Sequence, residues 1–512
     1  MFNLCCRGRF FGADPFYYKF YHYLCSMLTF SIDTFRDKFD KMPMAAVSLF
    51  LIAGIVTSYH FEIGSFVWIA LLALFLGLSF WRNGIVLMAI FALGGWLYNE
   101  RSYHLMPVGQ QAIMMLEIND NGINYGKYST YSADLLQYDK AACRARVRVT
   151  ADSLTTLRRG DIITAISTIR PFGDPQSSYA RSMRKQGYSG RVSVSEARII
   201  EWRIKERENL NHWAVTKLQS LLPQSDGRDV AIALSLGAKI AQHSDLKQSY
   251  SYSGVSHLLA VSGLHVGMVA LMLNMLLLPL LLLWRGNIIR STIVVMLIWL
   301  YVALCGYPTS AIRAAIMFSV LQLSHLTCNK YSQENAICSA AFIMLSLKPQ
   351  MLFELSFDLS FIAVMAIIFV GKPLCLTLHS RHLLIREAIN TTIISTACVF
   401  ATAPLISNTF GVISTLSIFL TPVVLVFAQI IIISSLLALV MPHAVAQIIF
   451  RAAEWCANIQ NNIIEWAVST HIGYADIRIS DTAMVVTYII MALLLLLSFG
   501  CNDQQEDEED KD

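Results

Sequence analysis

Long apolar runs dominate the chain, and one long polar segment interrupts them. The stretches near residues 44–60, 64–80 and 83–98 each approach the roughly 20 helical residues that cross a hydrocarbon core. Apolar runs resume after residue 257 and continue to about residue 499, whereas residues 101–208 carry frequent charges. This pattern predicts a polytopic α-helical membrane protein with about ten or eleven transmembrane helices and one inserted domain.

The inserted segment, residues 101–208, has the period of β-structure. Residues 144–150 alternate strictly, which places Arg144, Arg146 and Arg148 on one face of a strand. Turn-forming residues at 171–175 and a short helical stretch at 178–186 fit a small, OB-like β-barrel with a helical plug. Residues 140–205 contain 14 Lys and Arg against 5 Asp and Glu, a balance of +9, whereas the whole chain is only +4. Positive charge is therefore concentrated in this domain.

Basic residues also predict the orientation in the membrane. Positive charges fall on alternate loops that share one side, which the positive-inside rule makes cytoplasmic. The inserted domain then faces outward. The residues on these loops are Arg82, Arg285, Arg290, Lys330, Lys372, Arg381 and Arg386.

The remaining segments complete the expected organisation. No cleavable signal peptide is evident at the N-terminus, and the acidic C-terminal tail is expected to be disordered. We expect a cytoplasmic leader at 1–43, three transmembrane helices at 44–98, amphipathic linker helices at 209–256, a channel-type transmembrane domain at 257–441, an interfacial helix at 444–468 with a last transmembrane helix within 442–500, and the tail at 501–512.

Composition excludes several classes of protein. Hydrophobic residues make up 55% of the chain and charged residues 14%, which is far from the mix of soluble domains. The 11 cysteines form no CxxC pair and no zinc-type spacing with histidine. Neither an HExxH nor a GxxxxGK[ST] motif occurs. We therefore expect no metal, no cofactor and no nucleotide hydrolysis.

The densest polar motif in an apolar context is HLLAVSGLHVG, residues 257–267. His257, Ser262, Gly263, His265 and Gly267 are costly in lipid unless they face a cavity or a partner, so the motif predicts the lining of an aqueous passage. An alternative is helix packing through small residues, with His265 hydrogen-bonded in the core.

An intramembrane serine hydrolase is a further alternative for this motif. A serine and a histidine three residues apart lie on one helix, however. We therefore expect His265 to point along the face beside Ser262 instead of approaching its hydroxyl from another element, as a base must.

Arg313 lies inside a second apolar run, and an intramembrane arginine is by default functional or paired. Glu354 and Asp358, one turn apart, are candidate partners. An ion pair between Arg313 and Asp358 would hold two helices together, whereas an unpaired Arg313 would contact phosphate.

At these motifs the chain resembles the ComEC family of competence proteins. The resemblance rests on HLLAVSGLHVG at 257–267, on the G-x-P-x-S-A-x-R-A-x-x-M pattern from Gly306 to Met317, and on F-x-L-S-F from Phe357 to Phe361. It extends loosely to residues 174–187 and covers roughly residues 44–440. Asp358 stands where the family usually has Gln. The resemblance implies an inner-membrane channel for single-stranded DNA with an outward OB-like domain, here in a short form without the metallo-β-lactamase-like domain of full-length members.

A conduit for a polyanion needs a basic collecting surface. We expect DNA contacts from the inserted domain, no catalytic residue, and channel residues at the two membrane motifs. The expected partners are single-stranded DNA, a cytoplasmic DNA motor or helicase, a periplasmic DNA receptor, membrane lipid and a second copy of the chain. A transporter of another anion on the same scaffold is the alternative, as is a solvated charged surface that binds nothing. The DNA-contacting residues expected are Arg144, Arg146, Arg148, Tyr179, Arg181, Arg184, Lys185 and Arg191.

Overall fold

The computed structural model describes most of the chain between residues 42 and 494. The described residues are 42–61, 63–79, 85–101, 106–119, 122–124, 128–139, 141–152, 157, 160–173, 180, 183–184, 186–194, 198–203, 210–238, 246, 249–250, 252–255, 258–259, 261–326, 333–377, 383–411, 413–470, 474–475 and 477–494. Residues 1–41 of the leader expected at 1–43 lie outside them, and so does the tail expected at 501–512.

Apolar helices of membrane-spanning length make up much of the described structure. Five are long and apolar enough to cross a membrane: Pro43–Phe61, Gly286–Leu304, Leu355–Cys375, Ile389–Thr409 and Leu416–Val440. Shorter apolar helices are Ser65–Ser79, Gly263–Leu276, Thr309–Leu323, Glu334–Leu347 and Asp481–Leu494. The described chain therefore has the helices of a multi-span membrane protein.

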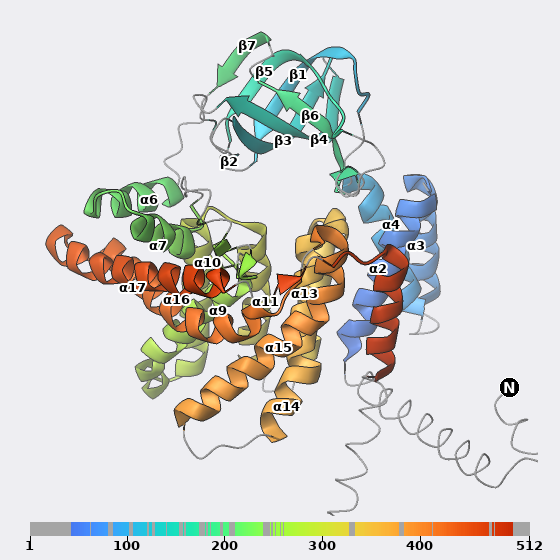
Figure 1. Cartoon of the computed structure of the whole chain (residues 1–512). Coiled ribbons are helices and arrows are strands. Elements are labelled where there is room, and N and C mark those ends of the chain that lie inside the picture. Colours follow the sequence, from blue (N-terminus) through green and yellow to red (C-terminus); the bar gives the residue numbers. More distant parts are fainter. Residues whose placement is uncertain are drawn as a thin grey trace, which may run out of the picture.

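The first three helices, α2 (Pro43–Phe61), α3 (Ser65–Ser79) and α4 (Val86–Arg101), form one bundle at the right of Figure 1. Glycines allow α2 and α4 to cross closely, since a Cβ on Gly54 would collide with the carbonyl oxygen of Phe91. A Cβ on Gly94 would likewise collide with the carbonyl of Leu51. Such small-residue crossings are typical of membrane helices, which gain little from apolar burial alone.

The inserted segment folds as a mixed sheet of seven strands, the sheet domain, at the top of Figure 1. Alternation along β4 buries Ala145, Val147 and Val149 completely, because every second side chain points into the core. Neighbouring strands follow the order β6-β4-β3-β1-β5-β7, with β2 beside β3. The strands are β1 (Gln111–Ile118), β2 (Ile123–Asn124), β3 (Tyr128–Tyr138), β4 (Ala141–Asp152), β5 (Ile162–Thr168), β6 (Tyr188–Ser193) and β7 (Arg198–Arg203).

The sheet differs from the closed barrel that we expected. Its hydrogen-bonded path is open and ends at β6 and β7. Strand β7 occupies the edge of β5 from Ile162 to Ile166, so β6 meets this side only beyond the end of β5. There, an isolated antiparallel bridge joins Arg170 to Arg191. The expected helical plug at 178–186 falls largely outside the described residues.

The helices after the sheet domain form a second body. Amphipathic α6 (Leu210–Leu221) and almost fully buried α7 (Asp226–Leu236) pack with α16 and α17 around one core. The elements that follow are α9 (Gly263–Leu276), η4 (Leu278–Leu282), α10 (Gly286–Leu304), α11 (Thr309–Leu326), α12 (Gln333–Leu347), η5 (Pro349–Phe353), α13 (Leu355–Ala366), η6 (Ile367–Gly371), α14 (Lys372–Thr377), α15 (Leu383–Phe410), β8 (Ile413–Ser414), α16 (Leu416–Val440), α17 (His443–Ser469) and β9 (Tyr474–Ala475).

Helix α17 corresponds to the helix expected at 444–468. It returns alongside α16, because β9 after it pairs with β8 before α16. One face is buried, while Ile448, Trp455 and Trp466 on the other are 66–73% exposed. Amphipathic helices with tryptophan on the outer face are typical of a membrane boundary.

We expect the crossing of α2 and α4 to tolerate no added methyl group. Gly54→Ala should destabilise the protein by about 1–3 kcal/mol, since a methyl must displace the α4 backbone. The melting temperature of the detergent-solubilised protein measures this effect. Gly77→Ala is the matched control, because nothing lies within 4 Å of its Cβ position and alanine favours helix. Equal melting temperatures for the two variants would contradict this account of the crossing.

Candidate functional site at the junction of sheet and helices

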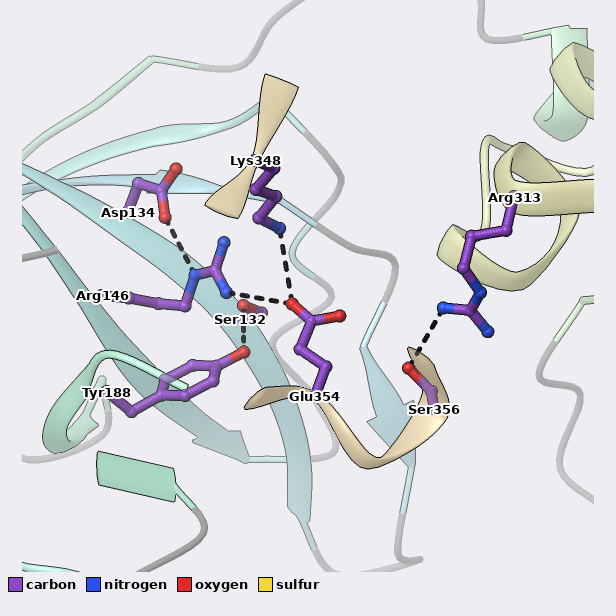
Figure 2. A network of polar contacts seen from close by, with 8 residues as sticks. All are labelled: Ser132, Asp134, Arg146, Tyr188, Arg313, Lys348, Glu354 and Ser356. Carbon is purple, nitrogen blue, oxygen red and sulfur yellow. Dashed lines mark hydrogen bonds and ion pairs between the residues drawn. The ribbon is translucent and has the colours of Figure 1, made fainter. Parts of the chain in front are cut away.

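Arg146 connects the sheet domain to the helical domain. Its side chain is only 8% exposed, and its Nε lies 3.4 Å from Oδ1 of Asp134 on the neighbouring strand β3. Its Nη1 lies 3.9 Å from Oε1 of Glu354, immediately before α13. Figure 2 shows the guanidinium between the two carboxylates. A buried arginine held by two acids joins elements more than 200 residues apart in sequence.

Lys348 shares the carboxylate of Glu354. Its Nζ lies 3.6 Å from Glu354 Oε1, at the loop between α12 and η5. Burial lowers the pKa of Lys348, the charge of Arg146 lowers it further, and Glu354 opposes both effects. Asp134, Arg146, Lys348 and Glu354, which we call the junction, therefore hold two cations and two anions in a poorly solvated place.

The aromatic ring of Tyr188 lies against the guanidinium group of Arg146. The guanidinium carbon lies 5.3 Å from the centre of the Tyr188 ring, a cation–π distance. The phenol oxygen lies 2.8 Å from Oγ of Ser132. Because Tyr188 is buried, it fixes the arginine and is not presented for stacking on a base in this arrangement.

The arginine face of β4 is turned towards the helices. Nη1 of Arg144 lies 3.5 Å from the carbonyl oxygen of Glu100, at the end of α4. Arg146 was expected to contact DNA from a free surface, and this expectation needs correction, because its side chain is buried and paired in the junction. Alternation along β4 puts Arg144 and Arg146 on the same face, as the sequence predicted. The sequence pattern does not show which part of the protein covers that face.

Further along the same face, three arginines occupy directly adjacent positions on neighbouring strands. Arg148 of β4 pairs in register with Arg191 of β6, and Arg191 bridges to Arg170. We call these three residues the arginine ladder. Strands are about 4.8 Å apart, and like charges placed directly opposite destabilise a sheet. Within the described structure neither Arg148 nor Arg191 forms an ion pair, and their expected contact with DNA stays a prediction.

The other residues expected on the DNA-binding surface are described only in part. Arg184 is exposed, just before β6. Tyr179, Arg181 and Lys185 lie outside the described residues, and so does His257 of the membrane motif. Their expected roles stay predictions.

Ser262 and His265 form the N-terminal cap of α9. The backbone N–H of Ser262 donates to Nδ1 of His265 at 3.0 Å, and the Ser262 hydroxyl lies 2.8 Å from the same nitrogen. As expected, His265 comes from the same element as Ser262 and not from another one, but the two side chains are in contact because Ser262 has the extended backbone of a cap, not that of a helix. Since Nδ1 accepts from a backbone N–H, it carries no proton, and the hydroxyl also donates to it.

Gly263 and Gly267 turn towards α11. A Cβ on Gly263 would lie 3.5 Å from Cβ of Ala314, and one on Gly267 would lie 3.1 Å from Cζ of Phe318. His265 is completely buried. These contacts are those of the packing alternative, in which small residues bring two helices together. The role of the motif as a passage lining stays a prediction.

Arg313 contacts a residue other than the expected one. Its Nη1 donates to Oγ of Ser356 at 3.2 Å, and it forms no ion pair with Asp358 in the described structure. Residues two apart on a helix point to opposite sides, so Ser356 and Asp358 project from different faces of α13. The helix turns its serine towards α11.

Sequence reasoning missed two members of the junction. Asp134 and Lys348 were not singled out, and Glu354 was considered only as a partner for Arg313. A signal existed in part, because Lys348 and Glu354 flank an outward loop between two apolar helices. Among the described residues, no group of histidine, cysteine and carboxylate side chains could hold a metal ion.

We expect the junction to act as a coupled unit. Arg146→Gln leaves the carboxylates of Asp134 and Glu354 short of a cation in a poorly solvated site, which costs on the order of 3 kcal/mol. Glu354→Gln removes the carboxylate that Arg146 and Lys348 share, so the positive charges of the junction are less well balanced. Combining the two changes should cost less than the sum of the single changes, as measured by thermal unfolding in a double-mutant cycle.

The control for this cycle is Arg203→Gln, since Arg203 and its partner Glu201 are both exposed on β7. Such a pair contributes little, so no change in melting temperature is expected. Strict additivity of the Arg146 and Glu354 variants would mean that the two side chains are not coupled.

Comparison with known proteins identifies the family. A family model described as Competence protein matches residues 234–500, about half of the chain. The chain is 33% identical over 156 residues to ComE operon protein 3 of Bacillus subtilis, covering 30% of this chain and 19% of that protein. It is 27% identical over 273 residues to an uncharacterized protein of Aquifex aeolicus, covering 51% of this chain and 62% of the relative.

The matched part thus spans less than two thirds of the length of either relative. No solved structure matches the chain. The family model covers α9, α11 and α13, which carry Ser262, Arg313 and Ser356. The chain belongs to the ComEC family of competence proteins.

Proposed function

We propose that this protein is a channel component of the inner membrane that takes up single-stranded DNA during natural transformation. The sheet domain collects the strand outside the membrane, the helices conduct it, and the chain itself catalyses no reaction. Family membership supports a role in competence, and the charge distribution of the sheet domain supports a polyanionic substrate.

One observation carries the proposal. The arginine face of β4 lies against the helices that carry the membrane motifs, because Arg146 pairs with Glu354 at the start of α13. A strand held by its phosphates on Arg148 and Arg191 would therefore already be beside the helical domain. Nonspecific capture by cations next to the mouth of a conduit raises the local concentration of a polyanion.

The strand order supports an OB-like domain. In order β1-β3-β4-β6, the last pair is parallel, and the bridge between Arg170 and Arg191 brings β6 to the end of β5. Together these strands approach a five-stranded ring. OB-type folds bind single strands in a basic groove that tolerates any sequence.

Orientation follows from the loops. Among the described loop residues, Arg285 and Lys372 lie at ends of apolar helices away from the junction, so we place the junction and the sheet domain in the periplasm. The junction residues Lys348 and Glu354 follow α12 and precede α13. With about ten or eleven spans, the protein is a multi-pass protein of the inner membrane, in contact with lipid.

The proposed partners follow from what the conduit needs. The sequence has no phosphate-binding loop motif, so a cytoplasmic DNA motor or helicase supplies the energy of uptake. A periplasmic DNA receptor presents the single strand, and a second copy of the chain forms a homodimer.

A serine hydrolase is the second candidate, because the Ser262 hydroxyl lies 2.8 Å from a histidine nitrogen. This contact has another explanation, however. Nδ1 also accepts the backbone N–H of Ser262, and the pair caps α9, so the nitrogen that would act as base is engaged in structure. A transporter of a different anion would use the same scaffold.

We expect deletion of the gene to block the entry of labelled DNA into the cytoplasm while leaving DNA bound at the cell surface. Wild type should restore internalisation, and His265→Ala should not, because it removes the cap and the buried side chain at the start of α9. Fluorescent DNA located inside and outside the cytoplasm measures the effect.

Ser262→Ala distinguishes the alternatives in the same cells. Alanine removes the hydroxyl but leaves His265 able to accept the backbone N–H, so uptake should persist at normal protein level. Complete loss with normal expression would favour the hydrolase. Internalisation that survives deletion would favour the transporter of another anion.

The arginine ladder should account for part of the electrostatic binding. Replacing Arg148 and Arg191 together by Gln removes two phosphate contacts, so the slope of log K against log salt for a single-stranded oligonucleotide should shrink by about 1.4. Fluorescence anisotropy with the purified full chain measures the slope. Arg203→Gln serves as an exposed arginine control in the same domain, and an equal change there would mean that net charge, not the ladder, determines binding.

A further inference from the structure

Arg313 is a buried cation, and its hydrogen bond in the described structure goes to a neutral side chain. The residue is 3% exposed, and its one hydrogen bond in the described structure goes to the hydroxyl of Ser356. Its Nε is buried and has no hydrogen-bond partner among the described residues. A buried guanidinium normally has a carboxylate or another anion to offset the loss of solvation.

The position of Arg313 makes this arrangement more unfavourable. Ser356 lies in the first turn of α13, a helix of 12 residues. The N-terminus of a helix carries partial positive charge and N–H groups without helical partners. Arg313 therefore points a positive charge at the positive end of a dipole. Both features favour an anion between them.

The nearby acids do not fill this role. Oε1 of Glu354 pairs with Arg146 and Lys348, and although the charge of Glu354 also acts on Arg313, the two side chains form no ion pair in the described structure. Asp358 projects from the face of α13 opposite to Ser356. Ser356 is exposed, so an anion from outside the helices can reach the hydroxyl group that the guanidinium of Arg313 contacts.

We propose that Arg313, the Ser356 hydroxyl and the first two N–H groups of α13, those of Leu355 and Ser356, bind one phosphodiester group, since the N–H of Phe357 already donates to the carbonyl oxygen of Glu354. Arginine presents a planar fork that matches two phosphate oxygens, and the hydroxyl and helix end supply further donors. The inference rests on the proposed function, because it assigns the phosphodiester to the backbone of single-stranded DNA.

The site also gives the conduit a second step after the junction. The turn from Glu354 to Ser356 has Arg146 and Lys348 on one side and Arg313 on the other (Figure 2). A phosphate that reaches this turn would meet Arg313 on the side away from the junction. Three cations and two carboxylates, counting Asp134, leave this path with a net charge of +1.

Salt-dependent binding tests the site in the full chain. The protein is purified in a maltoside detergent, which has no phosphate, and binds a single-stranded oligodeoxynucleotide. Arg313→Gln should weaken binding roughly tenfold, since a charge-assisted contact is lost. It should also reduce the slope of log K against log salt by about 0.7, the value for one phosphate contact. An oligonucleotide with uncharged methylphosphonate linkages should show no difference between variant and wild type.

Arg290→Gln is the matched control. Arg290 also bonds a neutral side chain, with Nη2 2.9 Å from Oδ1 of Asn274, but it lies at the opposite end of α10 from the turn that leads to Arg313. Its replacement should leave affinity and slope unchanged. If Arg313→Gln and Arg290→Gln have equal effects, the site is overturned while the proposed function stands. If wild type binds no single-stranded DNA at any salt concentration, the proposed function fails first.

Two further variants keep the test decisive if Arg313→Gln does not fold. Arg313→Lys retains the charge and loses the fork, so affinity should fall several-fold at an unchanged slope. Ser356→Ala should do the same, because it removes a neutral donor. If both variants bind as wild type does, the site is overturned.

Phospholipid carries the same phosphodiester chemistry, and added phosphatidylglycerol distinguishes the two sources. If Arg313→Gln reduces lipid retained by the protein, as measured by mass spectrometry, without changing the DNA slope, the assignment to DNA is overturned.

Discussion

Arg146 is a buried arginine whose positive charge is balanced by carboxylates from two domains. Asp134 on the adjacent strand supplies one carboxylate, and Glu354 before α13 supplies the other. Lys348 balances the second acid. Because each of these groups would be costly to bury alone, the four hold one another in place, and with them the position of the sheet domain over the helices.

This dependence determines what the basic face of the sheet can do. Were β4 turned away from the helices, its arginines would form an ordinary solvated surface. With Arg146 fixed at the junction, the ladder of Arg148, Arg191 and Arg170 lies on the same face of the sheet domain as the contact with the helices. Positive charge then continues on the far side of the same turn at Arg313. The proposed path of the DNA strand rests on these cations, which can contact phosphate but carry no means of reading base sequence.

Within the membrane, packing depends on different physics. Apolar burial offers helices little advantage over lipid, so close contact comes from small residues and from a few buried hydrogen bonds. Gly54 and Gly94 serve the first bundle, and Gly263 and Gly267 serve the contact of α9 with α11. The motif at residues 257–267, which looked most like a passage lining, therefore also packs helices together. In addition, its Ser262 and His265 cap α9.

The sequence by itself determined the apolar helices, the inserted basic β-domain, the alternation along β4 and the family resemblance, because all of these are written in local period and composition. It could not determine the partners of single charges. Arg313 meets Ser356 and not Asp358 because of how α13 is rotated, Arg146 is buried because β4 faces the helices, and the sheet remains open because β7 covers an edge of β5. Each of these depends on contacts between residues far apart in the chain, and such contacts exist only once the domains have packed.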